Sequence, residues 1–195
     1  MKLNLEIKNE EVYSIYYAKR QLYAFYKHYI YSFDLTNIKP RMPDDIKVER
    51  ITPDNVSLCE RGPYHVPRMI KYLKEQPDFV DGFLFFDKIS GKLLGFRWIM
   101  YKGGNEFQYR IRKTDAFFFD DYVVEECRGR GIYGKMYQWL FHYLKYEKGC
   151  KNACLAVRRN NKSAIRADEK AGGIITAKPN FIQIFRRYNI PYYKV

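Results

Sequence analysis

The stretch from Tyr122 to Leu144, YVVEECRGRGIYGKMYQWLFHYL, constrains the fold of this chain more than any other. It opens with β-branched and aromatic residues typical of a strand and then passes three glycines, Gly129, Gly131 and Gly134. The apolar residues that follow recur at helical spacing: Ile132, Met136, Trp139, Leu140, Tyr143 and Leu144. The stretch therefore predicts a strand, a glycine-rich turn and an amphipathic helix.

Glycines at the start of a helix leave main-chain N–H groups uncovered, because they carry no Cβ. These N–H groups and the partial positive charge of the helix terminus favour a bound phosphate. Arg128 and Arg130 add full positive charges beside the turn. The turn therefore predicts a binding site for a phosphate-bearing cofactor.

Two general phosphate-binding motifs match these glycines only in part. Residues 129–136 nearly spell the nucleoside-triphosphate loop, but Met136 stands where a hydroxyl group would bind magnesium. The three glycines also spell G-x-G-x-x-G, the dinucleotide motif. However, Glu125 and Glu126 would repel a pyrophosphate there, and only one strand–helix–strand unit surrounds the motif. An ordinary glycine turn before a surface helix is the simplest alternative.

The segment VVEECRGRGIYGKM resembles the acyl-CoA loop of the GCN5-related N-acetyltransferase (GNAT) superfamily. The family pattern is Arg or Gln, two residues, Gly, one residue, and then Gly or Ala. It falls here on Arg128, Gly131 and Tyr133. Tyr133 departs from the small residue of the family, so its ring is expected to narrow or reshape the pyrophosphate pocket.

A second segment, NNKSAIRADEKAGG at residues 160–173, resembles the later motif of the same family. The match falls on Asn161, Ala164 and Gly172, after a predicted strand at residues 153–158. Two weak motifs in the expected order and spacing are stronger evidence together than either is alone.

The resemblance implies an N-acetyltransferase that uses acetyl-CoA (coenzyme A). Main-chain groups at the end of the central strand would hold the pantetheine arm, the loop N–H groups would hold the pyrophosphate, and Asn161 would contact the cofactor at the sheet opening. The expected cofactor-binding residues are Tyr122, Val123, Arg128, Gly129, Arg130, Gly131, Ile132, Tyr133, Gly134, Lys135 and Asn161.

Asp121 and Asp168 are the candidate catalytic residues. The family often has a Tyr at the position of Asp168, where it protonates the leaving thiolate; a carboxyl group can do so at neutral pH only if its pKa is raised. The general acid is therefore open between Asp168, a tyrosine from elsewhere in the chain, and water. The general base is sought at Asp120 or Asp121, and the alternation of side chains along a strand lets only one of them point at the site. No His/Cys cluster has metal-ligand spacing, so no metal is expected.

The net charge of +13, from 35 basic and 22 acidic residues, favours polyanionic partners. The expected acceptor is the primary amine of a small molecule, for which an anionic compound would suit this charge. Two alternatives stay open: an aminoacyl-tRNA-dependent transferase of related fold, and a non-enzymatic nucleic-acid-binding protein whose aromatic residues stack on bases. Nucleic acid is the less favoured partner, because most aromatic side chains are expected in the core.

The order of predicted elements gives an α+β fold with a GNAT-like mixed, twisted β-sheet flanked by helices. Residues 46–195 would form the acetyltransferase domain, and residues 1–45 a tyrosine-rich, basic N-terminal extension. The periodicity of this extension is ambiguous between a helix and a pair of strands. It is expected to cover the acceptor site, to form a homodimer contact, or to pack on the core.

The cellular location is predicted from what the sequence lacks. No apolar run approaches 18 residues, and the charged start has no signal-peptide core. The four cysteines form no C-x-x-C pair. These features predict a cytoplasmic protein with no membrane span.

Overall fold

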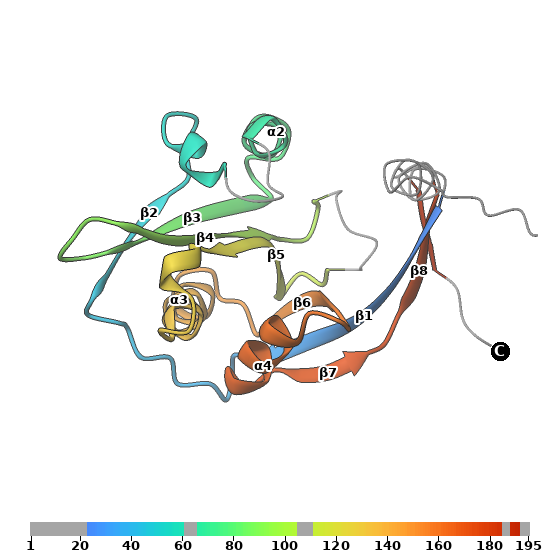
Figure 1. Cartoon of the computed structure of the whole chain (residues 1–195). Helices are drawn as coiled ribbons and strands as arrows, with labels where there is room; N and C mark the ends of the chain where they lie inside the picture. The colour runs from blue at the N-terminus through green and yellow to red at the C-terminus, as the bar shows by residue number, and fades with distance from the viewer. Residues whose placement is uncertain (1–22, 61–65, 105–110, 185–187, 192–195) are drawn as a thin grey trace, which may run out of the picture.

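The computed structural model describes residues 23–60, 66–104, 111–184 and 188–191 (Figure 1). Within these residues a nine-stranded mixed sheet forms the centre of the molecule. Its main path runs β2 (Ile46–Arg50), β3 (Val80–Asp87), β4 (Leu93–Met100), β5 (Asp115–Val123), β6 (Asn152–Arg158), β1 (Tyr23–Asp34), β8 (Asn180–Ile184) and β9 (Tyr188–Pro191). The strand β7 (Ile174–Ala177) lies off this path and pairs with β1. The β5–β6 pair is parallel, and the other described pairs are antiparallel.

Helices cover both faces of the sheet (Figure 1). The helix α2 (Val66–Glu75) lies on one face together with the short 3-10 turn η1 (Val56–Cys59). On the other face lie α3 (Ile132–His142), which continues into a π-helical turn η3 (Tyr143–Glu147), and α4 (Lys162–Lys170). This arrangement confirms the predicted α+β architecture. In the described part of the chain, no helix combines the length and the apolar character needed to cross a bilayer.

The alternation of side chains along the central strands divides the apolar residues into two cores. On β4, Phe96, Trp98 and Met100 are buried on the face of α2, where they join Met69 and Tyr72 of that helix. The intervening residue Ile99 is buried on the opposite face with α3. The sheet is therefore packed on both sides, and its central strands are apolar along most of their length.

The strand β1 shows where part of the predicted N-terminal extension lies. Residues 28–34 pair with β6, and residues 23–27 pair with β8, so β1 is an interior strand of the sheet. Its side chains Tyr31 and Phe33 are completely buried. Residues 23–34 thus form one long strand rather than the helix or strand pair between which the sequence was ambiguous. Residues 1–22 lie outside the described residues, and the domain boundary at residue 45 stays a prediction.

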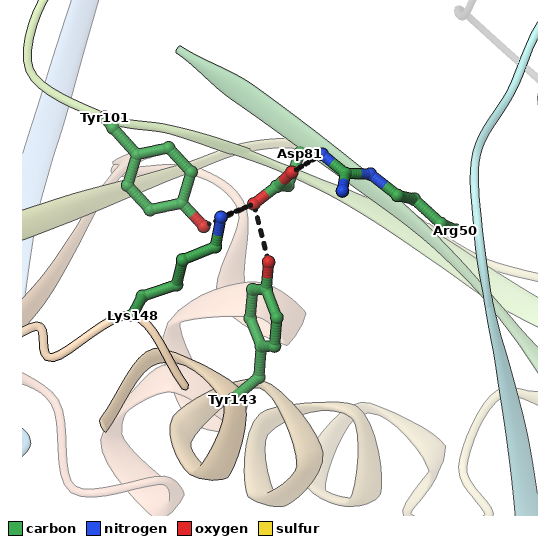
Figure 2. Close-up of polar contacts among 5 residues, drawn as sticks. All are labelled: Arg50, Asp81, Tyr101, Tyr143 and Lys148. Carbon is green, nitrogen blue, oxygen red and sulfur yellow. Dashed lines mark hydrogen bonds and ion pairs between the residues drawn. The ribbon is translucent and has the colours of Figure 1, made fainter. Parts of the chain in front are cut away.

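A buried carboxylate ties the start of β3 to the end of the α3 segment (Figure 2). Asp81 is 2% exposed and accepts hydrogen bonds from the hydroxyl groups of Tyr101 and Tyr143, both at 2.7 Å. Lys148 lies 3.0 Å from the same oxygen, and Arg50 pairs with the other one. Burial alone would raise the pKa of Asp81, but the hydrogen bonds from Tyr101, Tyr143 and Lys148 outweigh it and hold the pKa below its usual value. The cluster therefore stabilises the fold through an ionised aspartate.

We expect Asp81→Asn to lower the free energy of unfolding by about 3 kcal/mol, because it removes the buried negative charge that Arg50 and Lys148 share and replaces one acceptor oxygen with an amide group. Urea denaturation at neutral pH measures this change. Glu49→Gln is the matched control: it removes a surface carboxylate that pairs with Lys47, a contact worth less than about 1 kcal/mol. Equal losses for the two variants would contradict the stabilising role of the Asp81 cluster.

Candidate active site

The two parallel strands at the centre of the sheet part before they end. The described pairs between β5 and β6 run from Asp115 opposite Asn152 to Phe118 opposite Leu155 and then stop. Both strands continue, β5 to Val123 and β6 to Arg158. Beyond Phe118, the edge of β5 that faces β6 is therefore no longer paired with β6 in the described part of the chain. This separation is the sheet opening that the sequence predicted.

The glycine-rich loop lies at this opened end, between β5 and α3. Gly129 and Gly131 have φ angles of 76° and 75°, a left-handed conformation that glycine adopts without strain. A Cβ atom built on either residue would meet nothing within 4 Å. The Arg128 N–H donates to the Glu125 carbonyl, and the next main-chain donor with an acceptor among the described residues is the Lys135 N–H, which donates to Gly131. The N–H groups between them are available to a ligand at the positive end of α3.

The cationic side chains of the loop differ in how they are engaged. Arg128 folds back on the strand end, where its Nε donates to the Val123 carbonyl at 3.1 Å and its Nη1 lies 3.2 Å from Glu125. Lys135 forms an ion pair with Asp45. Arg130 is exposed and makes no ion pair within the described residues. Arg130 is thus the loop cation best able to meet an anionic ligand.

The side chain of Tyr133 points into the molecule. Its hydroxyl accepts a hydrogen bond of 2.7 Å from Nη2 of Arg97 on β4, and its ring packs edge-on against Tyr137. The ring therefore does not lie over Gly129 or Gly131. Tyr133 was expected to narrow or reshape the pyrophosphate pocket. Its side chain instead contacts Arg97 and Tyr137 beneath the loop.

Arg97 is an arginine side chain buried in the sheet, with 1% of its surface exposed. Its guanidinium carbon lies 4.5 Å from the ring centre of Phe118 and 4.6 Å from that of Tyr137. Nη2 also donates to the Tyr137 hydroxyl at 3.3 Å, whereas Nε and Nη1 have no hydrogen-bond acceptor among the described residues. A permanent positive charge is therefore held directly below the loop.

Asp168, a predicted catalytic residue, belongs to the same buried cluster. Its side chain is completely buried on α4 and accepts a 2.6 Å hydrogen bond from the hydroxyl of Tyr137. Burial raises the pKa of Asp168 to about 7, although the hydrogen bond from Tyr137 and the charge of Arg97 both act to lower it. Its Oδ2 atom has no hydrogen-bond partner in the described part of the chain. The carboxyl group has a pKa suited to a neutral-pH proton donor, but it lies behind Tyr137 rather than at the surface.

The two adjacent aspartates near the end of β5 lie on opposite faces of the sheet. Asp120 accepts a 3.0 Å hydrogen bond from the Tyr72 hydroxyl, on the face of α2. Asp121, the other predicted catalytic residue, lies 3.8 Å from Nη2 of Arg97, on the face of α3. The register of β4 and β5 shifts here, since Phe96 pairs with Tyr122 and Trp98 with Phe119. Asp120 has a φ of 40°, the single positive value at a non-glycine residue in the described chain.

The remaining predicted cofactor residues lie around the opening. The Tyr122 ring stacks on Phe96 with ring centres 5.9 Å apart, and Val123 pairs with Gly95, so the end of β5 is held by β4. Asn161 follows β6 and is the N-cap of α4, where its Oδ1 accepts a hydrogen bond from the Ala164 N–H. The structure thus brings the loop, the end of β5 and Asn161 to one end of the β5–β6 pair.

Sequence reasoning missed Arg97, Tyr137 and the pair Arg68 and Tyr72. A signal for Arg97 was present, because it is the one charge inside the apolar run LLGFRWIM, and a charge in a buried strand needs partners. Tyr137 and Tyr72 gave no such signal, since a tyrosine on the apolar face of a helix is usually core. Within the described residues, no group of three or more His, Cys, Asp or Glu is arranged to hold a metal ion.

Comparison with protein-family models gives a match to the acetyltransferase (GNAT) family over residues 54–172, which is more than half of the chain. No curated protein matches the sequence significantly.

Several solved structures share the fold. A GCN5-related N-acetyltransferase from Sphaerobacter thermophilus has a TM-score of 0.58 and 18% identity, over 90% of this chain and 56% of that one. A tandem GNAT protein from the clavulanic acid biosynthesis pathway has a TM-score of 0.61 and 14% identity, over 94% of this chain and 62% of that one. AAC(6')-Iy, solved with a bisubstrate analogue of coenzyme A, has a TM-score of 0.53 and 14% identity, over 68% of this chain and 92% of that one. The chain spans about three fifths of the length of the first two structures.

We expect the stability of the protein to fall as the pH rises from about 4 to about 7, through Asp168. The folded state holds the Asp168 proton up to a pKa of about 7, whereas an unfolded aspartate loses it near pH 4. The folded state therefore binds more protons in this interval, and raising the pH favours unfolding. Asp168→Asn keeps an acceptor for Tyr137 and removes the titration, so it should flatten this part of the curve. Thermal or urea unfolding at several pH values measures the slope, with the exposed Asp78→Asn as the control; an unchanged slope in Asp168→Asn would refute the assignment.

Proposed function

Because this chain belongs to the acetyltransferase (GNAT) family, whose members are acyltransferases, we propose that it transfers an acetyl group from acetyl-CoA to the primary amine of a small acceptor. The observation that carries this proposal is the row of available main-chain N–H groups between Gly129 and Gly134, at the N-terminus of α3 and beside the parted strands β5 and β6.

The loop residues fit the diphosphate of coenzyme A. The glycines leave room for phosphate oxygens close to the main chain, and the N–H groups and helix terminus supply positive charge. Arg130 adds a charge without an ion-pair partner in the described chain, and the buried Arg97 adds a second below the loop. Tyr133 leaves this space open because it is turned toward Arg97.

The opened edge of β5 fits the pantetheine arm. Beyond Phe118, β5 is paired with β4 but not with β6, so an extended ligand can lie along the edge of β5 that faces the opening. Tyr122 and Val123 lie on this segment, and Asn161 lies across the opening at the start of α4. Bound there, acetyl-CoA supplies the acetyl group as a thioester.

The reaction forms a bond between the amine nitrogen and the acyl carbon and breaks the bond from that carbon to sulfur. The amine loses a proton and the thiolate gains one. Asp120 lies on the face of α2 and is the carboxylate that meets an amine approaching from that side. Asp121 balances the charge of Arg97 on the other face. Asp168 keeps its predicted role as the source of the thiolate proton, which its raised pKa supports and which needs a group or water between it and the sulfur.

The similarity to AAC(6')-Iy supports coenzyme A as the donor, because that protein was solved with an analogue that contains it. The net charge of +13 bears on the choice of acceptor, because it disfavours the approach of polycations and favours acceptors that carry an anionic group. No feature of the described residues favours an aminoacyl-tRNA donor over coenzyme A.

Isothermal titration with acetyl-CoA, followed by a thiol-release assay with a panel of amines, tests the proposal. We expect saturable binding of coenzyme A and amine-dependent release of its thiol. A folded protein that gives no binding heat at micromolar concentration would refute the proposal. If RNA bound instead, with a steep salt dependence, the nucleic-acid alternative would replace it.

We expect Gly134→Glu to weaken coenzyme A binding by about 10-fold or more, because it places a negative charge in the first turn of α3, where the diphosphate would lie. Gly134 is exposed and helical, so a side chain adds no backbone strain. Gly134→Gln has nearly the same shape without the charge and should weaken binding far less. Titration calorimetry measures both variants, and equal affinities for Glu and Gln would place the diphosphate elsewhere.

A further inference from the structure

The two faces of the sheet are covered differently at the point where β5 and β6 part. On the face of α3, the Tyr137 hydroxyl donates a hydrogen bond to Asp168 of α4. The ring of Phe33 on β1 packs against that of Tyr137, with 5.1 Å between ring centres. These buried contacts close that face beneath the opening. A second substrate must therefore reach the thioester from the face of α2.

Charged side chains on the face of α2 gather at Asp120. The Arg68 guanidinium lies 3.6 Å from the Asp120 carboxylate and 5.6 Å from the ring centre of Tyr72, whose hydroxyl also bonds Asp120. The side chains of Arg68 and Asp120 are 53% and 16% exposed, so both charges can be reached from solvent. Tyr72 is buried and holds this pair against the sheet.

A second observation places an unused donor in the same region. Trp98 is completely buried on this face, and its indole N–H has no hydrogen-bond acceptor among the described residues. Its ring lies 5.4 Å from that of Tyr72 and 6.4 Å from that of Phe119, the residue before Asp120. A buried N–H without an acceptor in the described protein is a donor that a bound polar group could engage.

We propose that Arg68 and Asp120 form a paired-charge subsite for an acceptor that carries its amine next to a carboxylate or another small anion, as an amino acid does. This inference rests on the proposed acetyl transfer and names the substrate class. A simple cation gains little from a carboxylate that already has an arginine partner, and Arg68 repels it. An amphoteric acceptor can exchange partners: its ammonium group takes the place of Arg68 at Asp120, and its anion pairs with the released guanidinium. No charge is then left unpaired.

The overall charge of the chain agrees with this class of acceptor. The excess of 13 positive charges opposes the approach of polyamines and aminoglycosides and does not oppose a neutral zwitterion or an anionic amine. In this subsite Asp120 binds the amine. Arg68 binds the adjacent anion and so favours acceptors that carry one.

The test compares amino acids with their amides, which keep the amine and lose the negative charge. With acetyl-CoA as donor, we expect kcat/KM for the preferred amino acid to exceed that for its amide by about 10- to 100-fold, the effect of one charge-assisted contact. Arg68→Gln should remove this ratio by lowering the value for the acid and leaving that for the amide. Lys71→Gln, on the same helix and with the same change of charge, is the control and should keep the ratio.

A binding measurement separates this inference from the proposed function. Titration of the preferred amino acid into the protein with coenzyme A should give saturable binding that Asp120→Asn weakens about 10-fold. If coenzyme A binds and amides, simple amines or polyamines are acetylated as well as amino acids, the acceptor class is wrong and the acetyltransferase proposal stands. If coenzyme A does not bind, both fall.

Discussion

The parting of β5 and β6 after Phe118 and Leu155 is the constraint on which the proposed site depends. Parallel strands usually remain paired, because an unpaired main-chain group costs free energy unless water or a ligand satisfies it. Here the β5–β6 pairing stops only at one end of the two strands, and the same end carries the glycine loop and the N-cap of α4. An extended ligand with amide and phosphate groups can satisfy both sets of groups at once. In the proposed site, the opening and the loop would therefore act as one binding surface.

Tyr133 illustrates how a large side chain can be accommodated at a position where the family pattern has Gly or Ala. A tyrosine at the start of α3 would crowd a phosphate if its ring lay over the loop. Arg97, buried in β4, offers a hydrogen-bond donor and a positive charge below the helix, and the ring turns toward it. Burial raises the pKa of each of the two tyrosines, Tyr133 and Tyr137, well above the usual value of a tyrosine, so both remain neutral phenols beside the guanidinium. The loop keeps its space, and the helix start is fixed to the sheet.

How much of this could be predicted from sequence depends on the range of the interactions. The loop and α3 follow from local patterns, namely the glycines and the apolar periodicity, and α4 lies within the second motif at residues 160–173. The place of β1 does not, because its pairing joins residues 28–34 to residues 152–158, more than a hundred positions away. The raised pKa of Asp168 likewise requires its burial against Tyr137, a contact between two helices. Local geometry was predictable, whereas the environment of each charge was not.

The division of charge between the two faces is the clearest case, because one backbone irregularity decides it. Phe119 packs on the face of α2, and strict alternation would turn Asp120 away from that face and Asp121 toward it. The shift of register opposite Arg97 inserts one residue, so Asp120 stays on the face of α2 and Asp121 joins Arg97. The cost is a left-handed backbone at Asp120, about 1–2 kcal/mol for a residue with a side chain. Such strain persists where the surrounding structure holds it, and Tyr72 holds this carboxylate directly. The register shift, and not the alternation of the strand alone, therefore decides that Asp120 rather than Asp121 is the carboxylate on the face of the proposed acceptor subsite.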